Sequence, residues 1–399
     1  MVASNGPISC PDGAPTLVAA SRLVAERLSA GGRLLAHGEG RCLADAQHIA
    51  VEFLHPVITG RRALPALVGA NGRMSGDVVI SVAYGGSPPA AGADIVLTDR
   101  PKVSLPPGPV IEPEAGTAPT DRAAPLLDPS RRGQPTADGA PTDRGGGEEE
   151  TGATGEPVVV ALPSGAEAKE AAVVAYHVLW EVAHLFLDAE RPARPVAPAP
   201  QTDRAMASLY PMLYSAPGVP DGDLEEAALA SVRTKLAESV TVREQARHDN
   251  AEAIERAVEA LRVAPTVFTC GNGGSATDAA DLAHLLGERG RSLSGDIATV
   301  TALSNDVSFE VAFARPLATL GRAGDALVAI STRGSSPNVL AALAGAKSGG
   351  LATVGLAGYG GGGMVDVDLD ALLIVHSDSV HRIQEAQVCL YSEVVAGCL

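Results

Sequence analysis

Apolar runs, glycine-containing turns and helical patterns follow one another in the C-terminal half of the chain. The run at 266–269 leads into a glycine-rich turn at 270–275, and residues 276–286 repeat apolar side chains at helical spacing. A second apolar run at 325–330 leads into a hydroxyl-rich turn at 331–338 and a helical pattern at 339–347. This alternation predicts a parallel sheet covered by helices.

The N-terminal half repeats the pattern in shorter form. A helical pattern at 17–30 precedes a strand at 33–37 and a turn at 38–42, and further strands are expected at 77–82 and 158–162 before a helix at 166–187. When the halves are aligned, Gly38 falls on Gly271, Gly40 on Gly273 and Cys42 on Ser275. The first half is therefore predicted to be a degenerate, trimmed copy of the second.

Two connectors interrupt this order. Residues 101–157 are rich in Pro, Gly and Ala, contain the sequence APTDR twice, and are expected to be disordered. A second connector at 189–221 precedes a helix with a capping-box start at Asp223 and Glu226. The predicted domains are 16–188 with the insertion 101–157, a linker at 189–221, and 222–399.

The charge of the chain limits its partners. The 399 residues carry a formal net charge of −17, which argues against nucleic acid and anionic membranes as partners. No apolar run approaches the ~20 residues of a membrane span, and the N-terminus lacks a secretory pattern, so a cytoplasmic location is expected. An anionic ligand must then be held locally, by backbone amides and hydroxyls.

The two turns of the C-terminal half suit such a ligand. A glycine turn before a helix directs N–H groups at an anion, and Ser275 adds a hydroxyl. The second turn offers hydroxyls at Ser331, Thr332, Ser335 and Ser336, enough for the three oxygens of a phosphate monoester. A tight turn without a ligand is the alternative for the glycine motif alone.

Four motifs in one order give the chain a family resemblance. CGNGGS (270–275), ALSND (302–306), ISTRGSSPNV (330–339) and RIQE (382–385) resemble the sugar isomerase (SIS) family in its phosphoheptose isomerase, or sedoheptulose-7-phosphate isomerase, branch. The resemblance covers residues 224–399. It implies an α/β fold with two SIS-like three-layer αβα domains, each with a parallel sheet, of which the first is trimmed.

The resemblance assigns the phosphate and sugar contacts to the C-terminal domain. The implied phosphate-binding and sugar-contacting residues are Asn272, Gly273, Gly274, Ser275, Asp306, Ser331, Thr332, Arg333, Ser336 and Gln384. The family's catalytic positions are lost in this domain. Leu285 replaces a glutamate, Asp281 a histidine and Ser392 the final histidine.

The N-terminal domain keeps those catalytic types. His48 and Glu52 stand at i and i+4 of one helix, a spacing that suits metal binding and general-base chemistry. The resemblance implies Glu52 as carbon base, made a stronger base by a raised pKa at a partly buried interface, and His177 as proton shuttle. It also makes His48, Glu52 and His177 candidate zinc ligands, although Lys169 replaces a family glutamine and disfavours a metal.

Structural roles remain the alternatives for these residues, and two functions stay open for the whole chain. His48 and Glu52 also fit a solvated pair on an exposed helix, and His177 a core histidine. The first function is an aldose–ketose isomerase with a composite site between the two domains, acting on sedoheptulose 7-phosphate, in a homodimer that forms a pseudo-tetramer of SIS domains. The second is a non-catalytic protein that binds a sugar phosphate or a protein partner.

Overall fold

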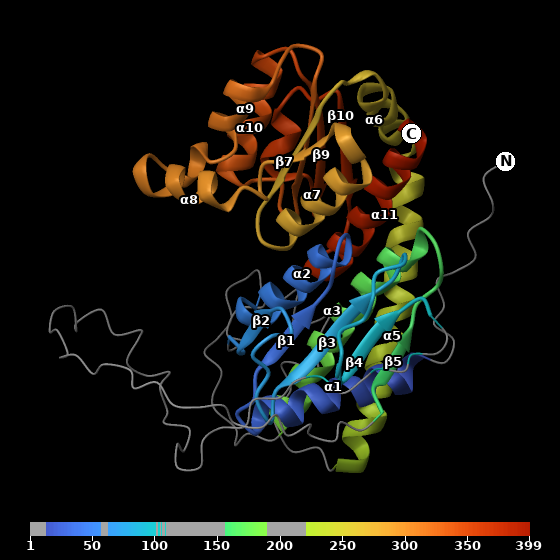
Figure 1. Ribbon diagram of the computed structural model, residues 1–399. Coiled ribbons are helices and arrows are strands. Elements are labelled where there is room, and N and C mark those ends of the chain that lie inside the picture. Colours follow the sequence, from blue (N-terminus) through green and yellow to red (C-terminus); the bar gives the residue numbers. More distant parts are fainter. Residues whose placement is uncertain are drawn as a thin grey trace, which may run out of the picture.

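The computed structural model describes residues 13–56, 63–100, 103, 105, 108, 156–189 and 221–399. The expected insertion at 101–157 and the expected linker at 189–221 therefore lie almost entirely outside the described residues. The described chain forms two α/β units, which are stacked one above the other in Figure 1.

The first unit is built on a five-stranded sheet in which all neighbouring strands are parallel. Its strands, in spatial order, are β2 (Ala66–Val68), β1 (Leu34–His37), β3 (Val78–Ala83), β4 (Ile95–Thr98) and β5 (Val158–Ala161). The sequence pattern predicts β1, β3 and β5. It does not predict β2 and β4, which have three and four residues.

Helices cover one face of this first sheet. Alternate strand residues such as Leu34 and Ile80 pack in the main core with the helices, whereas Leu35 and Val79 belong to a small cluster on the other face. The helices are α1 (Gly13–Ser29), α2 (Cys42–Leu54) and α3 (Glu167–Ala189). No described helix covers the second face, so the trimming expected from the sequence falls on that layer.

The second unit has a five-stranded parallel sheet with the same strand order. Its strands are β10 (Ala371–Val375), β9 (Ala352–Gly358), β8 (Ala326–Ser331), β6 (Val267–Gly271) and β7 (Gly290–Ser292). In both units the first strand of the unit, β1 or β6, lies second from one edge, and the second strand, β2 or β7, forms that edge. The later strands follow in chain order on the other side. This repetition confirms the predicted fold class of two parallel-sheet α/β units.

Helices cover both faces of the second sheet. The face toward the first unit carries α6 (Ala251–Val263), α7 (Gly274–Leu285) and α11 (Val380–Cys398), and the outer face carries α9 (Ala314–Leu320) and α10 (Pro337–Ser348). The remaining helical segments are η4 (Gly287–Arg289), α8 (Ile297–Asp306), η5 (Phe309–Val311) and η6 (Gly362–Asp366). Helix α8 extends from the body of the unit in Figure 1.

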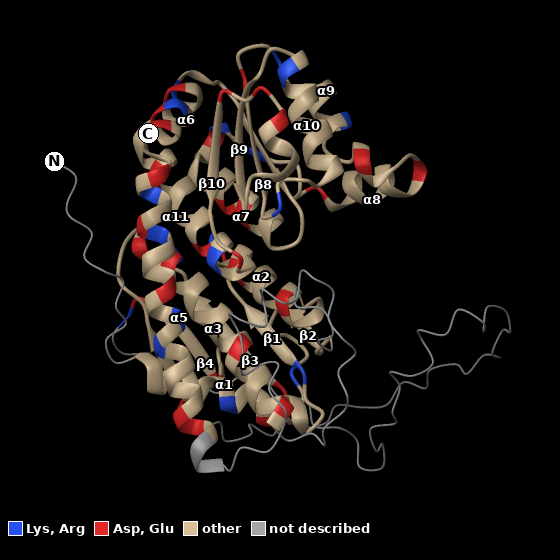
Figure 2. Ribbon diagram, turned by 180° about the vertical axis from the view of Figure 1, so that it is seen from behind, with Lys and Arg blue, Asp and Glu red and all other residues tan. Residues whose placement is uncertain are grey.

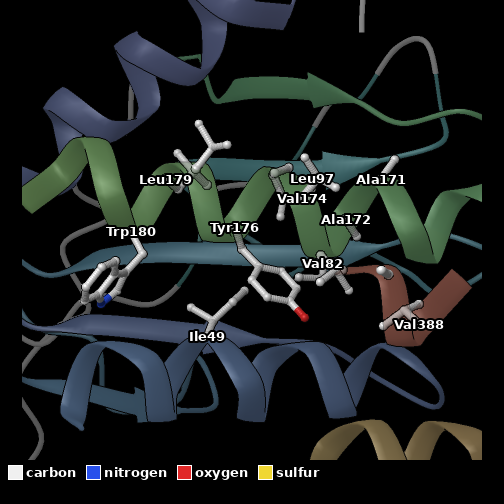
Figure 3. Close-up of a cluster of buried hydrophobic side chains, with 14 of the residues drawn as sticks. Ile49, Val82, Leu97, Ala171, Ala172, Val174, Tyr176, Leu179, Trp180 and Val388 are labelled. Atoms are coloured by element: carbon white, nitrogen blue, oxygen red, sulfur yellow. The ribbon is translucent and has the colours of Figure 1, made fainter. Parts of the chain in front are cut away.

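The two units share one hydrophobic core. Helix α5 (Asp221–Asp249) runs beside both units and packs against α1, α3 and α11, while α2 packs against α7. Ile49 of α2, Tyr176 and Trp180 of α3 and Val388 of α11 belong to the same buried cluster (Figure 3). Burial of apolar surface thus stabilises the pairing of the units as well as each unit.

Two helices bear on the expectations for a membrane span and for the charge of the chain. By length and composition α3 is apolar enough to cross a membrane, but 94% of its most apolar window is buried in the fold, which is typical of a core helix. Basic and acidic residues alternate along α5 (Figure 2), as on a helix with a solvated face.

Candidate functional site

The turn between β6 and α7 places a helix N-terminus at the edge of the second sheet. Gly273 has a φ of 55°, a conformation that favours glycine, and no side chain caps the start of α7. Ser275 is buried in the first turn of this helix. Because the first N–H groups of a helix have no partner within it, this turn has the form of an anion-binding site.

The turn between β8 and α10 adds hydroxyl groups. The hydroxyls of Ser331 and Ser336 lie 3.3 Å apart, and Ser336 is the N-cap residue of α10 without making a side-chain capping bond. Thr332 is half-buried and Arg333 is exposed. The predicted phosphate-binding residues of this turn therefore lie together at the start of a second helix.

A pair of asparagines joins the two turns. Asn272 Nδ2 donates to Asn338 Oδ1, and Asn338 Nδ2 donates back to Asn272 Oδ1, each at 2.9 Å. This reciprocal pair fixes the spacing of the turns. Asp306 lies outside this arrangement, because it is exposed at the end of α8 and accepts a hydrogen bond from Asn305 at 2.8 Å.

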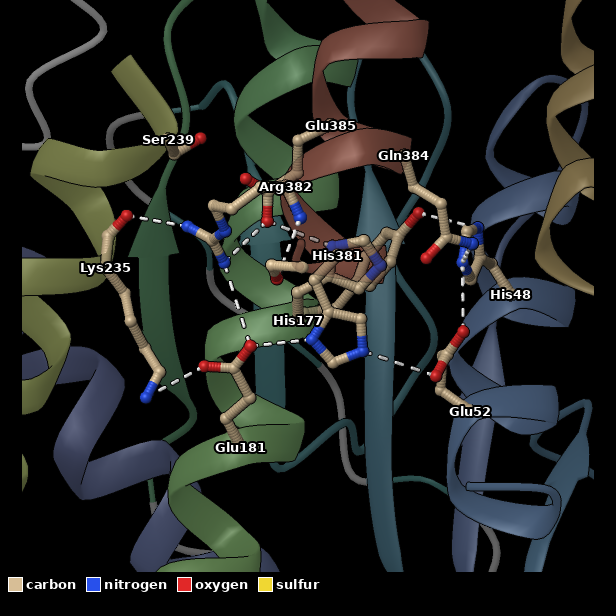
Figure 4. A network of polar contacts seen from close by, with 12 residues as sticks. His48, Glu52, His177, Glu181, Lys235, Ser239, His381, Arg382, Gln384 and Glu385 are labelled. Carbon is tan, nitrogen blue, oxygen red and sulfur yellow. Dashed lines mark hydrogen bonds and ion pairs between the residues drawn. The ribbon is translucent and has the colours of Figure 1, made fainter. Parts of the chain in front are cut away.

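The three residues singled out in the first unit come together at its border with the second. His48 and Glu52 on α2 and His177 on α3 each offer a ligand atom, and these atoms all lie within 4.8 Å of one another (Figure 4). His48 Nε2 lies 3.5 Å from Glu52 Oε1. All three side chains are buried, so the alternative of a solvated pair on an exposed helix is wrong.

The packing of α2 against α3 holds this cluster. Ile49, the neighbour of His48, lies in the core opposite Tyr176 and Trp180 (Figure 3). The indole Nε1 of Trp180 donates to the backbone oxygen of Glu52 at 2.8 Å. The backbone of Glu52 is thus tied to α3, which also carries His177.

His48 is the point of contact between the cluster and the second unit. Its Nδ1 lies 3.1 Å from both the Tyr176 hydroxyl and the Thr277 hydroxyl on α7, and its Nε2 lies 3.1 Å from Gln384 Nε2 on α11. A Cβ added to Gly274 would lie 2.6 Å from His48 Nε2. The residues of the first unit therefore lie directly against the glycine turn of the second unit, within one chain.

A further buried histidine, not predicted from the sequence, lies beside the cluster. His381 on α11 has its Nδ1 2.6 Å from Glu181 Oε1 and its Nε2 3.5 Å from Glu52 Oε2. Its ring stacks on that of His177, with centroids 4.4 Å apart. A signal was present in the sequence, because His381 stands one helical turn before Gln384 and such residues share a helix face.

The charges of the cluster follow from these contacts. Burial alone would raise the pKa of Glu52, but the contacts with His381 and His48 outweigh it and hold that pKa well below its usual range. The expected raised pKa is therefore wrong, because the expectation considered burial without the two imidazoles. Burial would lower the pKa of His381, yet Glu181 and Glu52 raise it to about 9.

His177 has the opposite balance. Burial, reinforced by the neighbouring His381 and His48, holds its pKa well below the ordinary value. His177 is accordingly neutral at pH 7. A neutral imidazole has one nitrogen that donates and one that accepts, as metal binding and proton transfer both require.

The donor set fits a zinc ion. Among the described residues, His177 Nε2 and Gln384 Oε1 are buried without a hydrogen-bond partner, and an imidazole nitrogen is an ordinary zinc ligand. Ligand atoms around zinc lie about 3–3.5 Å apart, so the 4.8 Å spread requires only small side-chain movements. Lys169 does not oppose this, because its Nζ is paired with Asp45 at 2.6 Å.

An ion pair occupies the position that the repeat of the two halves relates to the contact of His48 with Gly274. When the halves are aligned, Arg41 falls on Gly274. Arg41 donates from Nε and Nη2 to both oxygens of Asp281, at 2.6 and 3.1 Å. Asp281, which falls on His48 in the same alignment, also accepts from the Tyr391 hydroxyl at 2.8 Å. The two related positions between the units thus hold a His/Glu cluster in one case and an arginine–aspartate bridge in the other.

Comparison with known proteins gives the same family for the second unit. A family model described as SIS domain matches residues 234–358. A phosphoheptose isomerase of Paramagnetospirillum magneticum is 42% identical over 146 residues, which are 34% of this chain and 76% of that protein. A phosphoheptose isomerase of Helicobacter pylori is 38% identical over 157 residues, 37% of this chain and 81% of that protein.

A solved structure resembles both units together. It is the C-terminal domain of glucosamine-fructose-6-phosphate aminotransferase from Francisella tularensis, with a TM-score of 0.53 at 10% identity. The match covers 97% of this chain and 92% of that chain. At this identity the likeness concerns the fold alone, and it agrees with two α/β units in one chain.

Proposed function

Because the chain belongs to the SIS family, we propose that it is an aldose–ketose isomerase acting on a sugar phosphate at a composite site between its units. The expected reaction interconverts sedoheptulose 7-phosphate and a heptose 7-phosphate. The observation that supports the composite site is the position of His48 against Gly274 and Gln384. Each unit then supplies what the other lacks.

The second unit binds the phosphate in this proposal. The starts of α7 and α10 offer backbone N–H groups, and Ser275, Ser331 and Ser336 offer hydroxyls at the same edge of the sheet. Hydrogen bonds to an ionised acceptor are the stronger kind. Thr332 and the exposed Arg333 complete the anchor, and Gln384 of the same unit lies beside His48.

The first unit performs the proton transfers. Glu52 is ionised at neutral pH and takes the proton from the carbon beside the carbonyl, which gives an enediol, and returns it to the neighbouring carbon. Neutral His177 moves a proton between the two oxygens. A lowered pKa makes Glu52 a weak base, so the reaction also needs a group that acidifies the substrate carbon.

A zinc ion held by His48, Glu52 and His177 is our proposal for that group. When bound, the ion polarises the carbonyl oxygen of the substrate and so acidifies the adjacent carbon. Gln384 Nε2 faces His48 at 3.1 Å, and rotation of this amide would bring the unpaired Oε1 toward the same donor set. A cytoplasmic location remains part of the proposal.

One observation favours the non-catalytic alternative. Glu52 is only 3% exposed, so a substrate carbon reaches its carboxylate only if neighbouring side chains move. A protein that binds sugar phosphate or a partner without turning it over needs no such access. Binding of sedoheptulose 7-phosphate without any isomerisation is the result that selects this alternative.

We further propose that the protein forms a homodimer through α8. None of the residues of α8 is buried, and Ile297 at its start, Val307 directly after it and Phe309 in η5 are 75%, 61% and 50% exposed. Exposed apolar groups of this kind indicate an interaction surface, and a second copy of the chain would cover them. Sedimentation of the Ile297→Lys, Phe309→Ser double variant as a monomer supports the dimer, and a monomeric wild type contradicts it.

A coupled assay tests the proposed activity. The purified protein is supplied with sedoheptulose 7-phosphate, and separately with pentose and hexose ketose phosphates, after chelation and after zinc is restored. We expect turnover of the heptose substrate that is lost on chelation and regained with zinc. The absence of turnover with every substrate, in the presence of zinc, would refute the proposed activity.

A further inference from the structure

His381 is placed to act on the proposed site from the second unit. It is fully buried on α11 and lies between two carboxylates, Glu181 of α3 and Glu52 of α2 (Figure 4). Its ring is nearly parallel to that of His177, at an interplanar angle of 11°. The sequence comparison of the two halves gives no role to this histidine.

The two sides of the His381 ring have different partners. Nδ1 lies 2.6 Å from Glu181 Oε1, a short contact between an imidazole and a carboxylate. This contact fixes the rotation of the ring, and it turns Nε2 toward Glu52 Oε2 at 3.5 Å. The edge of Trp180 lies beside the ring, at a centroid distance of 5.3 Å and an angle of 84°, and limits its movement.

Glu181 is itself held in place. Its Oε2 lies 3.0 Å from Lys235 Nζ on α5, and its Oε1 lies 3.7 Å from Arg382 Nη2 on α11. A carboxylate with two cations beside it remains ionised and keeps its orientation. The chain of contacts from Lys235 through Glu181 and His381 to Glu52 joins four helices from both units.

The two oxygens of Glu52 are therefore directed to different neighbours. Oε2 faces His381, and Oε1 lies 3.5 Å from His48 Nε2. We propose that His381 is a positioning residue that fixes the Glu52 carboxylate, so that Oε1 is presented to the side of His48 and His177 where a metal and substrate are bound. This inference rests on the proposed function and adds a residue to it.

The proposal has a general physical basis. Groups that hydrogen-bond to a metal ligand orient it, and their loss typically lowers metal affinity or activity about 10–100-fold. His381 faces Glu52 as an ion-pair partner at 3.5 Å, close enough to orient the carboxylate in the same way, and Glu181 holds the other side of its ring. A purely structural histidine in a core would stabilise the fold without changing the affinity of the site.

Cobalt(II) binding to the full-length protein tests the proposal. Cobalt is titrated into metal-free wild type, His381→Leu, His381→Gln and the control His248→Ala, whose side chain is 85% exposed on α5. We expect cobalt to bind about 10–100-fold more weakly to His381→Leu. His381→Gln, whose amide can still donate to Glu52, should recover part of the affinity, and the control should match the wild type.

A crystal structure of a folded His381 variant separates failure of the positioning role from failure of the metal site. Glu52 should turn away from His48 in His381→Leu if His381 positions it. Unchanged cobalt affinity, or an unmoved Glu52 carboxylate in this variant, overturns the proposal. If the wild type binds no cobalt, the proposed metal site fails, and the position of Glu52 in the variant alone decides the role of His381.

Discussion

The imidazole of His48 on α2 lies against Gly274, the residue that opens α7 of the other unit. A Cβ at position 274 would come within 2.6 Å of His48 Nε2 and would also clash with the amide of Gln384. Only glycine allows the two units to approach in this way. A residue without a side chain is thus required at the place where the His/Glu cluster meets the phosphate turn.

The first prediction follows from this contact. Gly274→Ala should displace His48 and Gln384 and lower kcat/KM at least about 10-fold, since a small misplacement of reacting groups has large effects. Gly345→Ala is the matched control, because a Cβ there has no neighbour within 4 Å. Because Gly345 lies in helix α10, Gly345→Ala should stabilise the protein by about 0.5–1 kcal/mol. Equal activities of the two variants would contradict the contact.

A second prediction concerns the ion pair at the related position. Arg41→Ala leaves the buried Asp281 without its ion-pair partner, and breaking a buried pair costs about 3–5 kcal/mol. The melting temperature should fall by several degrees. Arg256→Ala, which removes an exposed pair with Glu252 at 3.9 Å, should change it little. Equal melting temperatures of the two variants would show that the Arg41–Asp281 pair does not hold the units together.

The third prediction is a pH dependence. Burial raises the pKa of Asp278 to about 6, and neither of its oxygens has a hydrogen-bond partner among the described residues. The pKa of this carboxyl is about 3.9 in the unfolded chain and about 6 in the folded protein. As pH rises through this range, the carboxyl ionises first in the unfolded chain. Its ionisation therefore lowers the free energy of unfolding, by about 2–3 kcal/mol above pH 6. Asp278→Asn should therefore stabilise the protein at pH 8 and have little effect at pH 4. Denaturation curves at both pH values measure this, and an equal effect at both contradicts it.

Phosphate binding gives the fourth prediction. Ser336→Ala removes one hydroxyl from the second turn, and a hydrogen bond to a charged group is worth about 1.5–3 kcal/mol. The affinity for a sugar phosphate should fall about 10–100-fold. Ser348→Ala at the other end of α10 is the control, since its hydroxyl bonds only the backbone oxygen of Ala344. Calorimetry that finds both variants equal to the wild type removes Ser336 from the site.

Much of the fold could be predicted from the sequence, because the long apolar runs of β3, β6 and β8 and the turns that follow them have clear periodic signals. The strands β2 and β4, of three and four residues, were not predicted. Strands β1 and β5 are as short as β4, but each leads into a predicted helix. The turn residues Ser275, Ser331 and Ser336 were likewise predictable from local motifs. For His381 the sequence shows only that it shares a helix face with Gln384. Its contacts with Glu181 and Glu52 were not predictable, since these partners lie 200 and more residues away along the chain.

The charge state of Glu52 shows a similar limit. Burial of a carboxylate predicts a raised pKa. The sequence places His48 one helical turn from Glu52, but it does not show that His381 lies on the other side of the carboxylate. Only the packing of α11 against α2 and α3 places His381 there. The sign of the pKa shift therefore depends on long-range contacts rather than on the local pattern.

The kinetics of Glu52→Gln test the composite site most directly. The substitution keeps the size of the side chain and removes the proton acceptor on the first unit, while the phosphate turns on the second unit stay intact. Loss of a general base typically lowers the rate about 10²–10⁴-fold. We predict that kcat for sedoheptulose 7-phosphate falls by such a factor while the affinity for the sugar phosphate remains nearly that of the wild type. Isomerisation by Glu52→Gln at the wild-type rate would contradict the composite site.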